Sequence, residues 1–120
     1  MKLVFAETAT AIENRTQTVT RRFEAEIKEL GAGDIIEAVA DDWMLHCPVK
    51  VPLLGRLEII SVAFEPLRRL ADDPAYGESE SRLEGIAPGI PSRARVSQFF
   101  FRHKSVSLDS MIARIEFRYI

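Results

Sequence analysis

The strictest constraint on the fold is the alternation of side chains between Ser110 and Ile120. One set of alternate positions there is Met111, Ala113, Ile115, Phe117 and Tyr119, and the other is Ile112, Arg114, Glu116 and Arg118. A period of two sends successive side chains to opposite faces of a β-strand. This segment is therefore predicted to be a half-buried strand, which requires a sheet with one covered face.

Four further segments have the composition of strands. Leu57–Phe64 is the clearest, and Ile35–Ala40 is a shorter run of the same kind. Met1–Ala6 is apolar with little alternation, which predicts a short strand buried on both faces. Thr16–Phe23 is rich in β-branched residues, which favour extended backbone. Five or six strands are expected in all.

Helical patterns separate these strands. They cover 7–14, 23–30, 65–70, 78–83 and 92–101. Asn14 is expected to end the first of them in the left-handed conformation, and Pro66 is expected in the first turn of the third. Residues 72–77 are expected to form a turn-rich bridge, and the connection 41–52 gives no clear pattern. The sequence therefore predicts an α+β fold with a small curled sheet and short flanking helices.

Size and composition fit one domain over residues 1–120. The chain has 47% hydrophobic and 28% charged residues, which is typical of a globular protein. One cysteine and two histidines offer neither an internal disulfide nor a recognisable zinc site, so no metal or cofactor is expected. The absence of a visible export signal or membrane span predicts a cytoplasmic protein. A net charge of −2 argues against dense coating of DNA phosphates.

The densest polar segment is Gln17–Arg22, with Thr18, Thr20 and Arg22 on one face of the expected strand. Guanidinium groups bind phosphate or stack on bases, and threonine and glutamine side chains hydrogen-bond to base edges. This composition indicates a ligand-binding site. The alternative is that the threonines and arginines solvate the outer face of a strand.

Asn14–Arg22 resembles the signature of the ASCH domain family, relatives of the PUA RNA-binding barrel. Further motifs follow in the family's order: Gly33-Asp34-Ile35-Ile36, the strand and turn of Leu57–Leu70, Glu84-Gly85, and Ile115-Glu116-Phe117. The resemblance covers nearly the whole chain. It implies a small PUA-like β-barrel of about five or six strands.

The resemblance also implies a function. ASCH proteins are predicted to bind RNA or nucleotides, some are described as nucleases, and a bacterial branch hydrolyses N4-acylated cytidine with a lysine, a threonine and a glutamate. The threonine corresponds to Thr20 and the glutamate to Glu84, but Gln17 occupies the lysine position. An amide does not titrate near neutral pH, so Gln17 cannot act as the base that activates a threonine.

Three functions remain open. In the first, a pocket of Gln17–Arg22 and Glu84 binds a nucleobase, nucleotide or RNA end. Gln17 and Thr20 would supply amide and hydroxyl contacts, and Thr18 is a further binding candidate. Arg21 or Arg22 would meet a phosphate, and Glu84 would accept from an exocyclic amine. Trp43 is expected either to stack on a base or to fill a gap in the core. In the second, the protein is an acylcytidine amidohydrolase or a ribonuclease in which Thr20 and Glu84 are catalytic. A displaced base would then come from Lys2, from Lys50 or from a water held by Glu84.

The third function is a protein-interaction module that uses Arg68-Arg69 and Arg93–Arg95 as surface anchors. Binding that weakens steeply with salt would separate a nucleic-acid ligand from an apolar protein interface. The sequence does not specify the oligomeric state.

Overall fold

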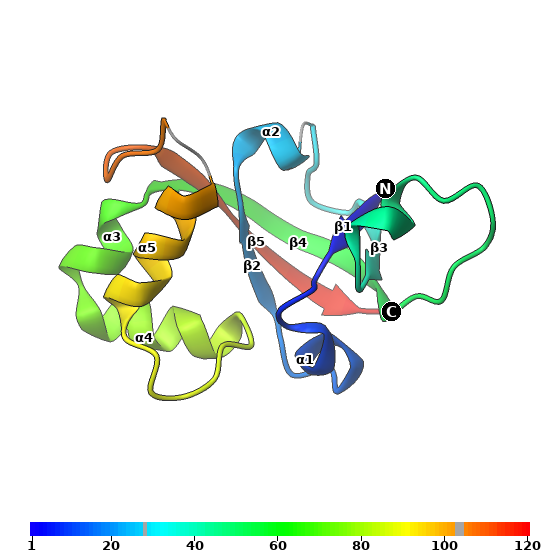
Figure 1. The fold of residues 1–120 in the computed structure, drawn as a ribbon, viewed down its shortest axis with the longest axis horizontal. Helices are drawn as coiled ribbons and strands as arrows, with labels where there is room; N and C mark the ends of the chain where they lie inside the picture. The colour runs from blue at the N-terminus through cyan, green and yellow to red at the C-terminus, as the bar shows by residue number, and fades with distance from the viewer. Residues whose placement is uncertain (28, 103–104) are drawn as a thin grey trace.

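The structure is a computed structural model that describes residues 1–27, 29–102 and 105–120. Five strands form one sheet in the spatial order β1-β3-β4-β5-β2. Their bounds are β1 (Lys2–Val4), β2 (Val19–Arg22), β3 (Ile35–Val39), β4 (Gly55–Pro66) and β5 (Met111–Tyr119). The sheet crosses the middle of the molecule, and the long strands β4 and β5 connect its two ends (Figure 1).

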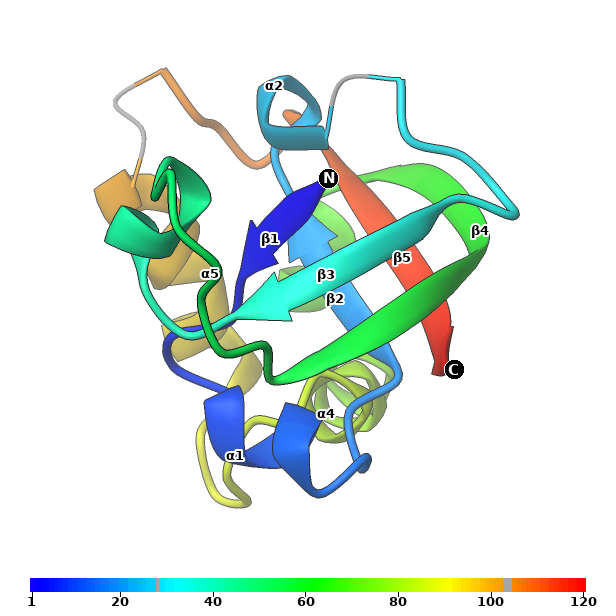
Figure 2. The same cartoon turned by 90° about the vertical axis from the view of Figure 1, so that its right-hand side faces the viewer.

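The sheet is mixed and strongly curled (Figure 2). β1 and β3 are parallel, whereas the other neighbouring strands are antiparallel. The β4–β5 register shifts between Ile59 and Ser61, and such a bulge increases local twist. The predicted α+β class is confirmed. The sheet is not closed into a barrel, because within the described residues β1 and β2 remain its two unpaired edges.

The side chain of Arg22 connects these two edges. Its Nη2 donates a hydrogen bond of 2.6 Å to the carbonyl oxygen of Val4 in β1. The guanidinium carbon also lies 4.7 Å from the centre of the Phe5 ring, within the range of a cation–π contact. A side chain thus takes the place of backbone pairing where the sheet remains open.

Three helices gather at one end of the sheet, and shorter elements surround the other end (Figure 1). The first group is α3 (Arg68–Asp72), α4 (Pro74–Leu83) and α5 (Ser92–Arg102). The others are α1 (Ala9–Glu13), α2 (Glu24–Ile27) and the 3₁₀ turn η1 (Asp42–Leu45). Helix α4 begins where Asp73 caps it, since its carboxylate accepts a 3.1 Å bond from the Tyr76 N–H.

The described residues form two buried apolar clusters. The larger one lies within the curl of the sheet and consists of Leu3, Phe5, Ile12, Ile27, Ile36, Ala38, Leu57, Ile59, Ala113, Ile115 and Phe117. The smaller one joins the helical end to the sheet through Leu67, Leu70, Val96, Phe99 and Ile112. The predicted strand is confirmed, and its alternation holds from Ala113 to Arg118, where Ile115 and Phe117 are buried and Arg118 is exposed. It fails at the start of the strand, where Met111 is exposed and Ile112 is buried in the smaller cluster.

Three local predictions were wrong. Pro66 is the last residue of β4, opposite Met111, and not in the first turn of a helix. Residues 74–77 belong to α4, because proline suits its first position and Asp73 supplies the cap. Asn14 keeps a right-handed conformation, and the left-handed residue after α1 is Arg15, with φ of 60°. The predicted helix over 23–30 is reduced to α2.

Gly85, which follows α4, provides a test of the packing beneath it. Its φ is +74°, and a Cβ there would lie 2.7 Å from the Cβ of Ala11. Gly33 has a φ of +90° but open space around it, so it is the matched control. We expect Gly33→Ala to lower the free energy of unfolding by about 1 kcal/mol and Gly85→Ala by about 2–4 kcal/mol, measured by urea denaturation. Equal losses of stability in the two variants would show that the close approach of Ala11 does not exclude a side chain at position 85.

Candidate functional site

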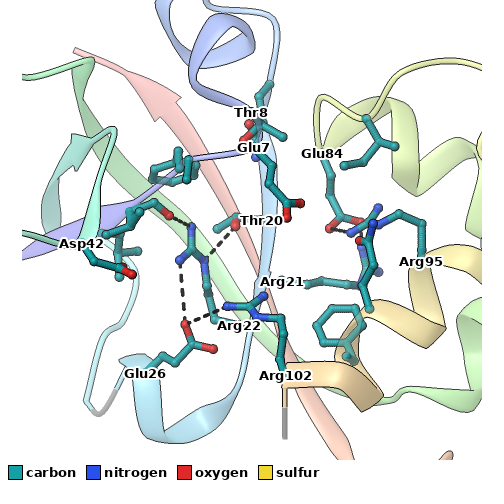
Figure 3. Close-up of a pocket in the computed structure, with 18 of the residues that line it drawn as sticks. Glu7, Thr8, Thr20, Arg21, Arg22, Glu26, Asp42, Glu84, Arg95 and Arg102 are labelled. Carbon is teal, nitrogen blue, oxygen red and sulfur yellow. Dashed lines mark hydrogen bonds and ion pairs between the residues drawn. The ribbon is translucent and has the colours of Figure 1, made fainter.

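A cavity of about 460 Å³ lies between the β1–β2 side of the sheet and helix α5. Its volume falls within the usual range for small-molecule sites. Polar side chains line most of it: Lys2, Glu7, Thr8, Gln17, Thr20, Arg21, Arg22, Glu26, Asp42, Glu84, Arg95, Gln98 and Arg102. Figure 3 shows how many of these groups converge on one space. The cavity is therefore suited to a ligand with several hydrogen-bonding groups.

Arg21 forms the rear of the site and binds three carboxylates. Its Nη1 donates to Glu84 at 2.7 Å, and its Nη2 donates to Glu80 at 2.7 Å and to Glu65. The Tyr76 hydroxyl lies 3.1 Å from the same Nη2 and donates to Glu65. Only 1% of the Arg21 side chain is exposed. The two Nη groups of this guanidinium therefore hold β2, β4 and α4 together, while its buried Nε has no hydrogen-bond partner among the described residues.

The ion pairs shift the pKa values of the groups involved. Burial opposes the charged form of Arg21, but the carboxylates of Glu84, Glu65 and Glu80 outweigh it and raise the arginine pKa. Burial likewise favours protonation of Glu65 and Glu80, yet hydrogen bonds from arginines lower both pKa values below the ordinary 4.5. Burial and the hydrogen bond to Glu65 raise the pKa of Tyr76 to about 12. Arg21, Glu65 and Glu80 are therefore charged at neutral pH, and Tyr76 is neutral.

Glu84 belongs to this cluster and also lines the cavity. One carboxylate oxygen accepts from Arg21, and the other accepts from Arg95 Nη2 on α5 at 2.8 Å. The residue is 4% exposed and caps the C-terminus of α4. Two guanidinium groups from two different elements thus fix the orientation of the carboxylate. Each of its oxygens retains lone-pair capacity for a further donor.

Gln17 and Thr20 are also buried beside the cavity. Gln17 Nε2 donates to the Val19 carbonyl at 2.9 Å, which assigns the other amide atom as oxygen. That oxygen, Oε1, is buried without a hydrogen-bond partner among the described residues. Thr20 Oγ1 accepts from Arg22 Nε at 3.0 Å, which leaves the hydroxyl proton free to be donated. Among the described residues, the unpaired buried side-chain atoms at the cavity are therefore one acceptor, Gln17 Oε1, and two donors, Arg21 Nε and Arg95 Nε. The Thr20 hydroxyl proton adds a further donor.

A second pair of arginines lies at the other side of the cavity (Figure 3). Arg22 Nη1 is 3.8 Å and Arg102 Nη2 is 3.7 Å from the same oxygen of Glu26. Burial lowers the pKa of Arg22, and the nearby charge of Arg102 acts in the same direction, while Glu26 opposes both. Arg102 is about half exposed, with 52% of its side chain accessible. Two cations share a single carboxylate here.

The structure brings together five of the seven site residues predicted from the sequence. Gln17, Thr20, Arg21, Arg22 and Glu84 all line the cavity. The alternative of a solvated strand face is wrong for β2, because all four of its residues are buried.

The other two predicted residues lie outside the cavity lining. Thr18 is held by its backbone: its N–H donates to the Leu83 carbonyl, and its carbonyl accepts from the Phe117 N–H. Trp43 lies in η1 with 59% of its surface exposed, so it does not fill a core gap. Lys50 does not line the cavity, whereas Lys2 does. Arg95, expected as a surface anchor, is buried against Glu84.

Sequence analysis named Glu84 but missed the other residues that surround Arg21. Tyr76, Glu80 and Glu84 are spaced by four along α4 and therefore share one helix face. That spacing indicates three side chains on one helix face, but it was not recognised because residues 72–77 were expected to form a turn-rich bridge. Glu65 and Arg114 join the cluster from β4 and β5. They lie close together because of the way these two strands pair, and the sequence alone does not specify that pairing.

Structural comparison finds solved proteins with the same fold. An ASCH domain from Lactobacillus crispatus has a TM-score of 0.61 and 12% identity, covering 94% of this chain and 70% of that one. An ASCH protein from Zymomonas mobilis has a TM-score of 0.59 and 17% identity, covering 98% of this chain and 65% of that one. The hypothetical protein PH0355 has a TM-score of 0.63 and 12% identity over the full length of both chains.

The chain therefore shares the fold of solved ASCH domains, as the resemblance in the sequence motifs implied. No family model matches the sequence, and no curated protein matches it by sequence. Among the described residues, no group of three or more His, Cys, Asp or Glu side chains is arranged to hold a metal ion. None of the helices in the described ranges has the length and apolar character needed to cross a bilayer.

The importance of the Arg21 cluster is testable by Arg21→Met. The variant leaves three buried carboxylates without their common partner, so we expect the free energy of unfolding at pH 7 to fall by about 3–5 kcal/mol. Arg118→Met is the control, because Arg118 pairs with Glu58 at the surface, and it is expected to cost less than about 1 kcal/mol. Urea denaturation measures both.

The difference in stability between the parent protein and Arg21→Met should depend on pH. The lowered pKa values of Glu65 and Glu80 mean that their stabilising effect is present above 4.5 and is lost as the pH falls through the lower values of the folded state. The difference between the parent protein and Arg21→Met should therefore shrink below about pH 4.5. A constant difference from pH 7 to pH 3 would contradict the role assigned to Arg21.

Proposed function

We propose that the cavity binds a nucleobase, presented by a nucleoside, a nucleotide or RNA. The observation that carries the proposal is the buried Gln17 Oε1, an acceptor without a partner beside a cavity of about 460 Å³. A buried polar atom left without a hydrogen bond is costly, so its retention favours a ligand that supplies the missing donor. An exocyclic amine or ring N–H of a base is such a donor.

The neighbouring groups extend the same pattern. The Thr20 hydroxyl supplies a donor, since its oxygen already accepts from Arg22. Glu84 supplies lone pairs fixed in direction by Arg21 and Arg95. A base edge carries both donors and acceptors, which matches a site that offers acceptors on Gln17 and Glu84 and a donor on Thr20. The buried Nε groups of Arg21 and Arg95 are also unpaired among the described residues. The ASCH fold of the solved neighbours supports this assignment, because it is a PUA-like fold and the PUA barrel is associated with RNA.

The same contacts favour binding over hydrolysis. A threonine nucleophile requires a base within hydrogen-bond reach, whereas the partner of Thr20 Oγ1 is the Arg22 guanidinium, which accepts no proton. Gln17 cannot act as a base, and no hydrogen bond among the described residues joins Lys2 or Glu84 to the Thr20 hydroxyl. We therefore propose that Thr20 and Glu84 position the ligand and do not catalyse amide or phosphodiester cleavage.

Calorimetric titration with nucleosides, including N4-acetylcytidine, and short RNAs tests the proposal. Thr20→Val removes the hydroxyl next to the cavity and is expected to weaken binding about tenfold, the effect of one lost hydrogen bond in a buried site. Thr18→Val makes the same chemical change outside the cavity lining and should leave the affinity unchanged.

Three results would contradict the proposal. They are an absence of binding across the panel, equal losses from the two threonine variants, and release of acetate from N4-acetylcytidine by the parent protein. A ligand detected only as a protein partner, with affinity insensitive to salt, would instead support the interaction module.

A further inference from the structure

Arg22 and Arg102 lie at the side of the cavity away from Glu84, and the ion pairs of the described residues give them one shared carboxylate, Glu26. Glu7 and Asp42 also line the cavity. Arg22 and Arg102 face a single carboxylate oxygen of Glu26 at 3.8 and 3.7 Å. Both distances exceed the length of a hydrogen bond, so neither guanidinium donates directly to Glu26. The carboxylate is held separately, because its other oxygen accepts from the Phe23 N–H at 3.2 Å.

The donors of Arg22 are only partly used. Nε donates to Thr20 and Nη2 donates to Val4, which fixes the plane of the group. Among the contacts of the described residues, Nη1 has only the long ion pair with Glu26. Arg102 reaches the same place from α5 and is half exposed, so a ligand can approach it. Two guanidinium groups arranged in this way favour an anion with several acceptor oxygens.

We propose that Arg22 and Arg102 bind a phosphate group of the ligand, in competition with the carboxylate of Glu26. The inference rests on the proposed nucleobase site and specifies its ligand as a phosphorylated nucleotide or a phosphodiester-linked strand. Arg22 makes the connection between the two subsites, since it contacts Thr20 through Nε and faces Glu26 through Nη1. A base beside Thr20 therefore has a guanidinium next to it, on the side of the cavity opposite Glu84 (Figure 3).

Arg21 does not take this role, although it follows the same motif. Its two Nη groups are bound by Glu65, Glu80 and Glu84, which leaves no net positive charge for a ligand. Adjacent arginines in one strand point to opposite faces. One of them holds the core of the protein together, and the other faces the cavity with Arg102.

The experiment compares nucleosides, their monophosphates, dinucleoside monophosphates and inorganic phosphate by calorimetry at low salt. The monophosphate is expected to bind about tenfold more tightly than the matching nucleoside. A preference for the monoester identifies a free nucleotide or a strand end as the ligand, whereas equal or tighter binding of the dinucleoside phosphate identifies an internal phosphate of a strand.

Three variants locate the effect. Arg102→Gln should abolish the preference for the monophosphate and leave nucleoside affinity unchanged. Glu26→Gln removes the competing charge while its amide oxygen can still accept from Phe23, so nucleotide affinity should rise several-fold. Arg93→Gln is the matched control, because it removes the same charge from an exposed position of α5 that does not line the cavity, and it should change neither affinity.

The outcomes separate the two proposals. Equal affinities for nucleoside and nucleotide, or equal effects of Arg102→Gln and Arg93→Gln, would overturn the phosphate site and leave the nucleobase site standing. A decrease in nucleotide affinity on Glu26→Gln would also overturn it. Binding of inorganic phosphate that depends on Arg102, without binding of any nucleoside, would confirm the anion site and overturn the nucleobase site.

Discussion

The ion pairs of Arg21 with Glu65, Glu80 and Glu84 are the interaction on which the rest of the structure depends. They join β2 to β4 and α4 through a side chain that is 1% exposed. Removing charges from water is costly, and that cost is recovered here only because every carboxylate has at least one further partner: Arg69, Arg114 or Arg95. The cluster thereby fixes Glu84 at the wall of the cavity with a defined orientation.

This arrangement gives the two adjacent arginines different functions. The charge of Arg21 is neutralised by ion pairs within the protein. Arg22 instead faces the cavity, and its hydrogen bond to the Val4 carbonyl connects the open edges of the sheet. A site of this kind is preorganised, because its polar groups are oriented by the fold before any ligand enters. The cavity is therefore a product of the same contacts that stabilise the domain.

Sequence patterns predicted the α+β class and the strand at 110–120, and the ASCH resemblance grouped Gln17, Thr20 and Glu84, which line one cavity. Alternation and β-branched composition are local properties of the chain, so strands could be predicted from them. The sharing of Glu65, Glu80 and Glu84 by one arginine depends on contacts between positions 44 to 63 residues apart, which no local pattern encodes. The function of Trp43 was equally unreadable, since its exposure depends on how the 41–52 connection folds.

A crystal structure of the protein grown with a nucleoside monophosphate is the most direct test of the account. The base is expected within hydrogen-bond distance of Gln17 Oε1 and Thr20, with the phosphate between Arg22 and Arg102 and the Arg21 cluster unchanged. A ligand bound on another face of the molecule, or one that enters only after Arg21 has left its three glutamates, would contradict it.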